Sequence, residues 1–482
     1  GLEEPVDFVS DEALSMGERL ARLPQVLSTL FTLLRSFKKL KSEVPAWLKR
    51  FEMNYAAIER EGMAELPLSG LMATLETLDE RLLNDWHTPI INDFYVMMSV
   101  GKLRRRLAKA DIADVDDLMN RLLAGEEEIE STQPVRQLMA IAAIIRKSET
   151  LKAILNGCAP EDAVEALSTH SSELREHFKR YLERYGDRCM GELKLETITL
   201  REDTRFIGQV LSSYVPREDL VPETLSQREQ AMRKEAEGQM SAAMGAWARR
   251  KAMAALNQAR HAVKQRESMR LARTRMFGLY RAAYQAIGMR LAKAGALKGP
   301  RDVFYLSVEE IAAYYEGRSV GAALGPLATT RRDEFLAYED VEVPNRITAR
   351  APVYLNMPVV EVDLEPGDKE ARVLYGIGCY PGVVEAECKV IRSPQDELDL
   401  NGRLLTALRT DPGWAPLFPT CSGILIERGS TLSHSAVVAR ELGIPAVVGV
   451  KNLLSIVTDG ERVRLDGERG TATRVSLDEK PE

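Results

Sequence analysis

The fold of the C-terminal part of the chain is decided by residues 423–450, which read GILIERGSTLSHSAVVARELGIPAVVGV. The apolar run GILIE predicts a buried strand, RGSTLS a turn, HSAVVARELG a helix that Gly443 ends, and AVVGV a second strand. Short strands that alternate with a helix in this way are typical of a small α/β unit. His434 is then expected in the first turn of the helix.

The position of His434 at a helix start has chemical consequences. Thr431 and Ser433 are common capping residues, and Ser435 adds a third hydroxyl next to the imidazole. The positive end of a helix disfavours a protonated ring, so we expect His434 to stay neutral and nucleophilic near pH 7. Free backbone N–H groups and these hydroxyls would bind the oxygens of a phosphoryl group on the ring. Geometry alone also allows a role in packing or capping.

This segment resembles the phosphohistidine swivelling domain of the phosphoenolpyruvate-utilising enzymes. The similarity runs from YGIGCYPGVVEAECKVI (375–391) to the C-terminus, about a quarter of the chain, and includes DGERVRLDGERGTATRV (459–475). The resemblance implies that His434 carries a phosphoryl group and that its domain moves between sites. The family's turn usually carries two glycines, whereas Ser430 stands in place of the second one here.

The chain before this domain has a helical pattern. Apolar residues recur at three- and four-residue spacing up to about residue 320, which predicts helices. The proline-free residues 227–268 predict a long helix or a helical hairpin. Residues 321–370 contain several prolines and predict a linker with a short strand or two. We therefore expect a multidomain, mainly α protein, with a helical acceptor-binding domain (1–320), a linker (321–370) and a small α/β phosphohistidine domain (371–482).

The helical pattern also selects a branch of the family. Its members combine the histidine domain with an ATP-grasp module that charges the histidine and a module that receives the phosphoryl group. A TIM-barrel receiver needs eight alternating strands and helices, which residues 1–320 do not show. A helical receiver is similar to the rifampin phosphotransferase branch. The resemblance implies a small-molecule acceptor, either an antibiotic-like alcohol or a carboxylate that is activated for a condensation.

One candidate acceptor site is a helix face rich in arginine. Arg266, Arg270 and Arg273 lie at helical spacing i, i+4 and i+7, beside Glu267. Guanidinium groups bind phosphate through paired hydrogen bonds, so this face could meet the incoming phosphoryl group. A solvated surface face with ordinary ion pairs explains the same pattern.

A second candidate site follows residue 184, in RYGDRCMGELKLE, where relatives often read YGHRG. This stretch supplies Asp187, Arg188, Glu192 and Glu196, and a carboxylate there could take a proton from an acceptor hydroxyl. A structural cluster of ion pairs is the alternative. Asn92 and Asp93 are polar residues within an apolar stretch, where they would line a pocket or cap a helix.

The charging module has no counterpart in this sequence. An ATP-grasp module needs a glycine-rich phosphate loop and metal-binding carboxylates, and neither pattern is present. Because the sequence also begins with Gly1 rather than Met, we expect a fragment or the partner of a separate charging subunit. ATP and Mg would then bind an ATP-grasp domain, in cis or in trans, rather than this chain. The other histidines show no metal-ligand spacing with His434, so no metal site is expected.

Composition limits the remaining classes of function. The net charge is −7, with 65 basic and 72 acidic residues interspersed, which argues against a nucleic-acid partner. No apolar run reaches the roughly 18 residues of a membrane span. Five scattered cysteines indicate a reducing, cytoplasmic compartment. The main alternative is a non-catalytic or regulatory phosphocarrier whose helical domain binds a protein. A pocket that faces His434 would favour the enzyme, and a flat helical surface would favour the carrier.

Overall fold

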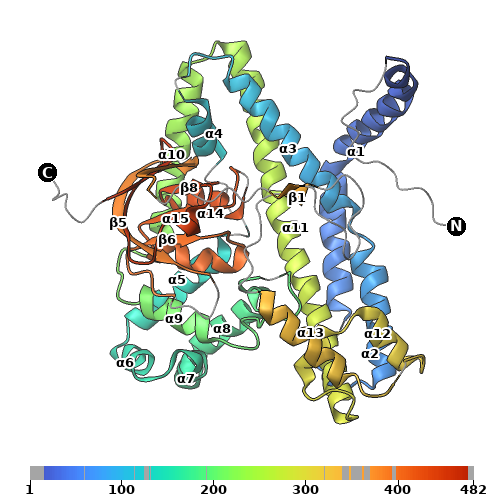
Figure 1. Cartoon of the computed structure of the whole chain (residues 1–482). Helices are drawn as coiled ribbons and strands as arrows, with labels where there is room; N and C mark the ends of the chain where they lie inside the picture. Colours follow the sequence, from blue (N-terminus) through green and yellow to red (C-terminus); the bar gives the residue numbers. More distant parts are fainter. Residues whose placement is uncertain are drawn as a thin grey trace.

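The computed structural model describes most of the chain as a large helical part followed by a smaller part around one sheet (Figure 1). This arrangement confirms the predicted fold class. The described residues are 16–58, 60–112, 114–123, 130, 132–191, 193–319, 321–338, 347–348, 361–362, 370–392, 398–431 and 433–475.

One long helix organises the helical part. α11 (Ala246–Lys293) is 48 residues long and runs through the centre of the molecule, side by side with α3 (His87–Leu107) (Figure 1). It follows α10 (Pro222–Ala242), and the chain reverses at Ala243–Gly245. The stretch that predicted a long helix or a hairpin is therefore a hairpin with one very long arm.

Shorter helices form three clusters, of which two pack along α11. Against its C-terminal half lie α1 (Met16–Ala56), η1 (Glu61–Glu65), α2 (Leu68–Leu78) with its π-helical continuation η2 (Asp79–Leu83), η4 (Pro300–Tyr305), α12 (Val308–Tyr315) and α13 (Gly325–Ala337). Against its N-terminal half lie α10, the end of α3 and α4 (Val115–Leu123). The third cluster comprises α5 (Gln133–Arg146), α6 (Glu149–Gly157), η3 (Pro160–Asp162), α7 (Ala163–His170), α8 (Ser172–Tyr185) and α9 (Arg205–Tyr214).

The segment predicted as a linker begins with a helix instead. α13 starts with Pro326 in its first turn, where the ring replaces an N–H that no helical carbonyl would accept. It packs on η4 and so extends the helical part to Ala337. Beyond it, β1 (Ile347–Thr348) and β2 (Glu361–Val362) pair antiparallel. The other residues between 339 and 369 lie outside the described part of the chain.

Eight strands form the sheet of the C-terminal part. They are β3 (Val373–Tyr375), β4 (Ile377–Tyr380), β5 (Val383–Val390), β6 (Leu404–Ala407), β7 (Gly423–Ile426), β8 (Ala446–Val448), β9 (Arg462–Asp466) and β10 (Thr471–Arg474). Their order is β3-β10-β9-β5-β6-β7-β8-β4, in which β5 to β8 run parallel and the other pairs are antiparallel. β6, β7 and β8 are buried throughout, which explains their unbroken apolar sequences.

The sheet curls until its two edges meet. β3 and β4 stand at opposite ends of the strand order, yet only Gly376 separates them in the chain. The N–H of Gly376 donates to the carbonyl of Gly470, 2.8 Å away. A Cβ on Gly376 would lie 2.7 Å from the side chain of Val447, so this closure needs a residue without a side chain.

The elements that bear the predicted site lie where the sheet meets the helical part. α14 (His434–Leu442) follows β7, is buried along its whole length and ends at Gly443, whose φ of 69° suits glycine. η6 (Pro412–Thr420) is also fully buried and packs against α5 and α9, where the hydroxyl of Tyr214 donates to the carbonyl of Pro416 at 2.6 Å. The short α15 (Leu453–Ile456) follows β8.

Candidate functional site

The turn before α14 sets the orientation of His434. Ser433 is the N-cap, and its hydroxyl accepts a hydrogen bond from the N–H of Ala436 at 3.4 Å. The hydroxyls of Ser433 and Ser435 lie 3.1 Å apart. Thr431 is not the cap. Its backbone carbonyl instead accepts a hydrogen bond from Arg440 at 2.8 Å. His434 is thus in the first turn, as predicted, and of the two predicted cap candidates only Ser433 is the cap.

His434 points out of its own domain and onto α11. Its Nδ1 lies 3.7 Å from Oε2 of Glu267, which is beyond hydrogen-bonding distance, and His434 is only 5% exposed. Neither ring nitrogen has a hydrogen-bond partner among the described residues. Glu267 is 1% exposed, and its Oε1 accepts from Arg270 at 3.1 Å. Glu267 belongs to the helical part and His434 to the C-terminal α/β part. The interface between these two parts is called the seam below.

The electrostatic surroundings keep His434 neutral and Glu267 charged. Burial lowers the pKa of His434 most; Glu267 opposes this effect, and the charges of Arg188 and Arg270 add to it. Burial raises the pKa of Glu267, but Arg270, His434 and Arg266 outweigh it and bring that pKa to about 2. A neutral imidazole was expected from the helix dipole, whereas burial is the larger cause.

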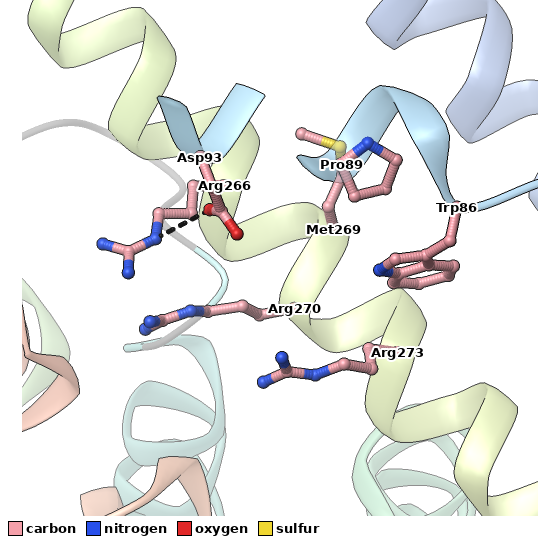
Figure 2. A pocket seen from close by; sticks show the side chains of 7 residues that line it. All are labelled: Trp86, Pro89, Asp93, Arg266, Met269, Arg270 and Arg273. Carbon is pink, nitrogen blue, oxygen red and sulfur yellow. Dashed lines mark ion pairs between the residues drawn. The ribbon is translucent and has the colours of Figure 1, made fainter. Parts of the chain in front are cut away.

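Arg266, Arg270 and Arg273 share one face of α11, as their spacing predicted, and they line a pocket beside Glu267. Figure 2 shows the three guanidinium groups pointing to the same side of the helix, whereas Trp86 and Pro89 lie towards its other side, near Met269. Met269 and Asp93 complete the wall. The Nε of Arg266 lies 3.1 Å from Oδ1 of Asp93. These arginines are half-buried, so an open solvated face does not describe them.

The second predicted cluster is an ion-pair centre next to the same site. Asp187 and Arg188 are both buried. Oδ1 of Asp187 lies 2.7 Å from Arg60 and 3.7 Å from Arg201. Arginines thus surround this carboxylate, which fits the structural alternative better than a proton acceptor. Arg188 is close enough for its charge to lower the pKa of His434. Glu192 lies outside the described residues.

The two polar residues of α3 have different environments. Asn92 is fully buried, and its amide donates to the carbonyl of Ala262 on α11 at 3.3 Å, so it joins the two helices. Asp93 lines the pocket. The sequence did not point to Trp86, Pro89 or Met269 as pocket residues. Aromatic and apolar side chains are normally expected in a core, and only the contact between α3 and α11 brings them to this site.

Metal-ligating clusters and membrane-spanning helices are both missing from the described part of the chain. No group of three His, Cys, Asp or Glu residues there has the arrangement of a metal site. Of the helices described, none combines the length and the apolar character that crossing a membrane requires.

Two family models match this chain. Residues 400–470 match the mobile domain of PEP-utilising enzymes, and residues 86–267 match the fourth domain of rifampicin phosphotransferase. The predicted resemblance is therefore confirmed. His434 lies in the first match and Glu267 is the last residue of the second, so the site joins the two matched domains.

Curated relatives extend over both domains. The rifampicin phosphotransferase of Bacillus subtilis is 27% identical over 348 residues, and that of Streptomyces sviceus is 30% identical over 344 residues. Each alignment covers 69% of this chain and 38% of the relative. A prodigiosin-synthesizing transferase of Serratia marcescens is 26% identical, over 73% of this chain and 40% of its own length. This chain thus spans less than half of the length of these relatives.

Proposed function

We propose that this chain, which carries the mobile domain of the PEP-utilising enzymes together with the fourth domain of rifampicin phosphotransferases, is the phosphohistidine and acceptor portion of a phosphotransferase. His434 carries a phosphoryl group and delivers it to a small molecule bound between α11 and α3. ATP and Mg act on an ATP-grasp module, in the same longer protein or in a separate subunit.

One observation carries this proposal: His434 and Glu267 are both buried, Nδ1 of His434 lies 3.7 Å from Oε2 of Glu267, and the arginine-lined pocket is beside Glu267. A histidine with only a capping role has no need for a carboxylate and arginines from another domain. Burial in such a charged setting instead matches a group that exchanges a phosphoryl group there, because arginines stabilise the charge on phosphate oxygens.

Glu267 selects the ring nitrogen that reacts. A proton on Nδ1, directed towards Oε2 of Glu267, leaves the lone pair on Nε2. The phosphoryl group then bonds to Nε2, while Glu267 stabilises the positive charge of the phosphorylated ring. The low pKa of Glu267 keeps the carboxylate ionised for this task at neutral pH.

Delivery requires an oxygen nucleophile in the pocket. The acceptor oxygen forms a bond to phosphorus, the P–N bond breaks, and its electron pair returns to Nε2. A hydroxyl acceptor loses its proton to the carboxylate of Glu267, whereas a carboxylate acceptor has none to lose. A weak base is sufficient because phosphoryl transfer passes through a loose transition state, in which positioning and charge stabilisation matter most. We expect Arg266, Arg270 and Arg273 to supply that stabilisation, because they line the pocket.

The pocket favours a small-molecule acceptor over a protein. Its wall combines Trp86, Pro89 and Met269 with charged groups, the mixture expected for a ligand with an apolar body and a polar reactive end. An antibiotic-like alcohol and a carboxylate substrate of a condensing enzyme both have this character. A regulatory phosphocarrier is the second candidate, and the pocket lined by Arg270, which binds Glu267, supports the small-molecule acceptor instead.

A pulse–chase experiment tests delivery. The chain is charged with labelled phosphate by the ATP-grasp domain of a relative, separated from ATP, and mixed with rifampicin or with the low-molecular-mass fraction of a cell extract. We expect label to pass to a small molecule. Arg270→Gln should slow this step about 100-fold, as expected for loss of one charge-stabilising donor, and should leave charging intact.

Arg249→Gln is the matched control, since Arg249 is exposed at the start of the same helix. It should transfer label like the wild type. Label that passes to a protein would support the carrier. Release as inorganic phosphate alone, at equal rates in both variants, would rule out an acceptor site on α11.

A further inference from the structure

A further polar contact crosses the seam, between α4 of the helical part and α14 of the phosphohistidine domain. Arg440 of α14 donates through Nη1 to Oδ1 of Asn120 on α4, 2.8 Å away. The amide of Asn120 donates in turn to the carbonyl of Gly378 in β4 at 3.3 Å. Asn120 and Arg440 are each 3% exposed. One side chain of the helical part therefore binds two elements of the other domain.

Arg440 also binds the turn that precedes the histidine. Its Nη2 donates to the carbonyl of Thr431 at 2.8 Å. This bond lies within the phosphohistidine domain and stays with it when the domain moves, whereas both bonds of Asn120 have to break. Docking against α4 is thereby linked to the position of the turn, and the turn leads directly into His434.

We propose that Asn120 and Arg440 form a docking latch that holds the phosphohistidine domain in register, so that His434 faces Glu267. Both are positioning residues, because neither touches the reacting nitrogen. The inference rests on the proposed function only in assuming that this domain leaves the helical part. A hydrogen bond to a buried charged group stabilises the docked state, and without it Arg440 would be buried with an unmet donor.

If the latch holds the domain docked, its removal should expose His434 to solvent more often. Asn120→Ala removes the two hydrogen bonds that this side chain makes across the seam and leaves the sequence of the phosphohistidine domain unchanged. We expect diethyl pyrocarbonate to modify His434 about tenfold faster in this variant, equivalent to about 1.4 kcal/mol in the docking equilibrium. Peptide mass spectrometry resolves the individual histidines. Asn120→Asp should bring the rate back towards wild type, because its carboxylate still accepts from Arg440.

Two controls separate undocking from loss of structure. Asn54→Ala removes a side-chain hydrogen bond to the carbonyl of Arg81, far from the seam, and should leave the rate at His434 unchanged. The rate at the half-buried His177 should be equal in all variants. A wild-type rate at His434 in Asn120→Ala, or a parallel rise at His177, would overturn the latch. The assay uses no phosphoryl donor. A chain that cannot be phosphorylated would therefore contradict the proposed function and leave the latch unaffected.

Discussion

At the scale of single residues, the site depends on a balance of buried charges. Glu267 is deeply buried yet ionised, because Arg270 and its neighbours outweigh the cost of its burial. Its charge in turn limits how far burial lowers the pKa of His434. Alone in an apolar core, Glu267 would not keep its charge, whereas burial by itself would keep His434 neutral. Glu267 and His434 therefore form one unit, which is complete only when the two parts of the molecule are docked.

The lowered pKa of His434 predicts a pH dependence of stability. An unfolded histidine titrates near 6.5, so below about pH 6.5 the unfolded chain binds a proton that the folded chain resists. The free energy of unfolding should therefore decrease as the pH falls from 7 to 5.5. Glu267 adds a second loss only below its ordinary value of 4.5, since its pKa is lowered as well.

Urea denaturation at pH 7 and pH 5.5 measures this dependence. His434→Gln should flatten the decline of the midpoint, whereas His261→Gln, at an exposed position on α11, should keep it. An unchanged slope in His434→Gln would show that this histidine is not held neutral by burial.

Residue-scale prediction from sequence succeeded where the signal was local. The first-turn position of His434 and the shared face of Arg266, Arg270 and Arg273 follow from helical spacing, and the structure has both. The partner of each group is far away in sequence and could not be predicted from spacing. Asp187 illustrates this limit, because only the fold places Arg60 beside it.

At the scale of elements, α11 positions most groups of the candidate site. Its successive faces pack on α3, line the arginine pocket and lie against the ion pair of Asp187. Gly278 makes the last contact possible, since a Cβ at this position would lie 2.2 Å from Cγ of Asp187 and 2.5 Å from Arg60. The absence of a side chain at this point of the helix lets the buried ion pair, and Arg188 next to it, pack close to α11.

Gly278→Ala should therefore disturb the site at a distance. Alanine favours a helix by up to about 1 kcal/mol over glycine, but here it forces Asp187 away, and overpacking of a buried site costs about 1–3 kcal/mol. We expect a net loss of stability and slower delivery from His434, because Arg188 shifts with Asp187. Thermal unfolding and the pulse–chase assay measure the two effects.

Gly101→Ala provides the comparison on α3. No atom lies within 4 Å of a Cβ added at Gly101. This variant should keep or slightly gain stability and deliver at the wild-type rate. If both alanine variants behaved alike, close packing of Asp187 against α11 would be irrelevant to the site.

Elements whose apolar residues recur at regular spacing were predictable, and elements without such spacing were not. The α10–α11 hairpin and the strand–turn–helix around His434 lie where the pattern placed them. α13 was missed, because its apolar residues do not recur at helical spacing and a proline stands at its start. Its stability comes from contacts with η4, which the local sequence does not contain.

At the scale of the whole molecule, the proposed function places the site at the seam between the two parts. A curled sheet presents α14 and η6 to the helical part, and both are buried there along their whole length. The order of helical and α/β regions was predictable from the change in pattern. The docking face was not, because Asn120, Glu267 and His434 meet only through the tertiary fold.

The central claim is that His434 carries the phosphoryl group. The most direct test incubates the chain with the ATP-grasp domain of the Bacillus subtilis relative and with ATP labelled in the β- or γ-phosphate. The account predicts acid-labile, base-stable label on the wild type and on His261→Ala, and none on His434→Ala. Label that persists in His434→Ala, or no label on the wild type under any condition, would contradict it.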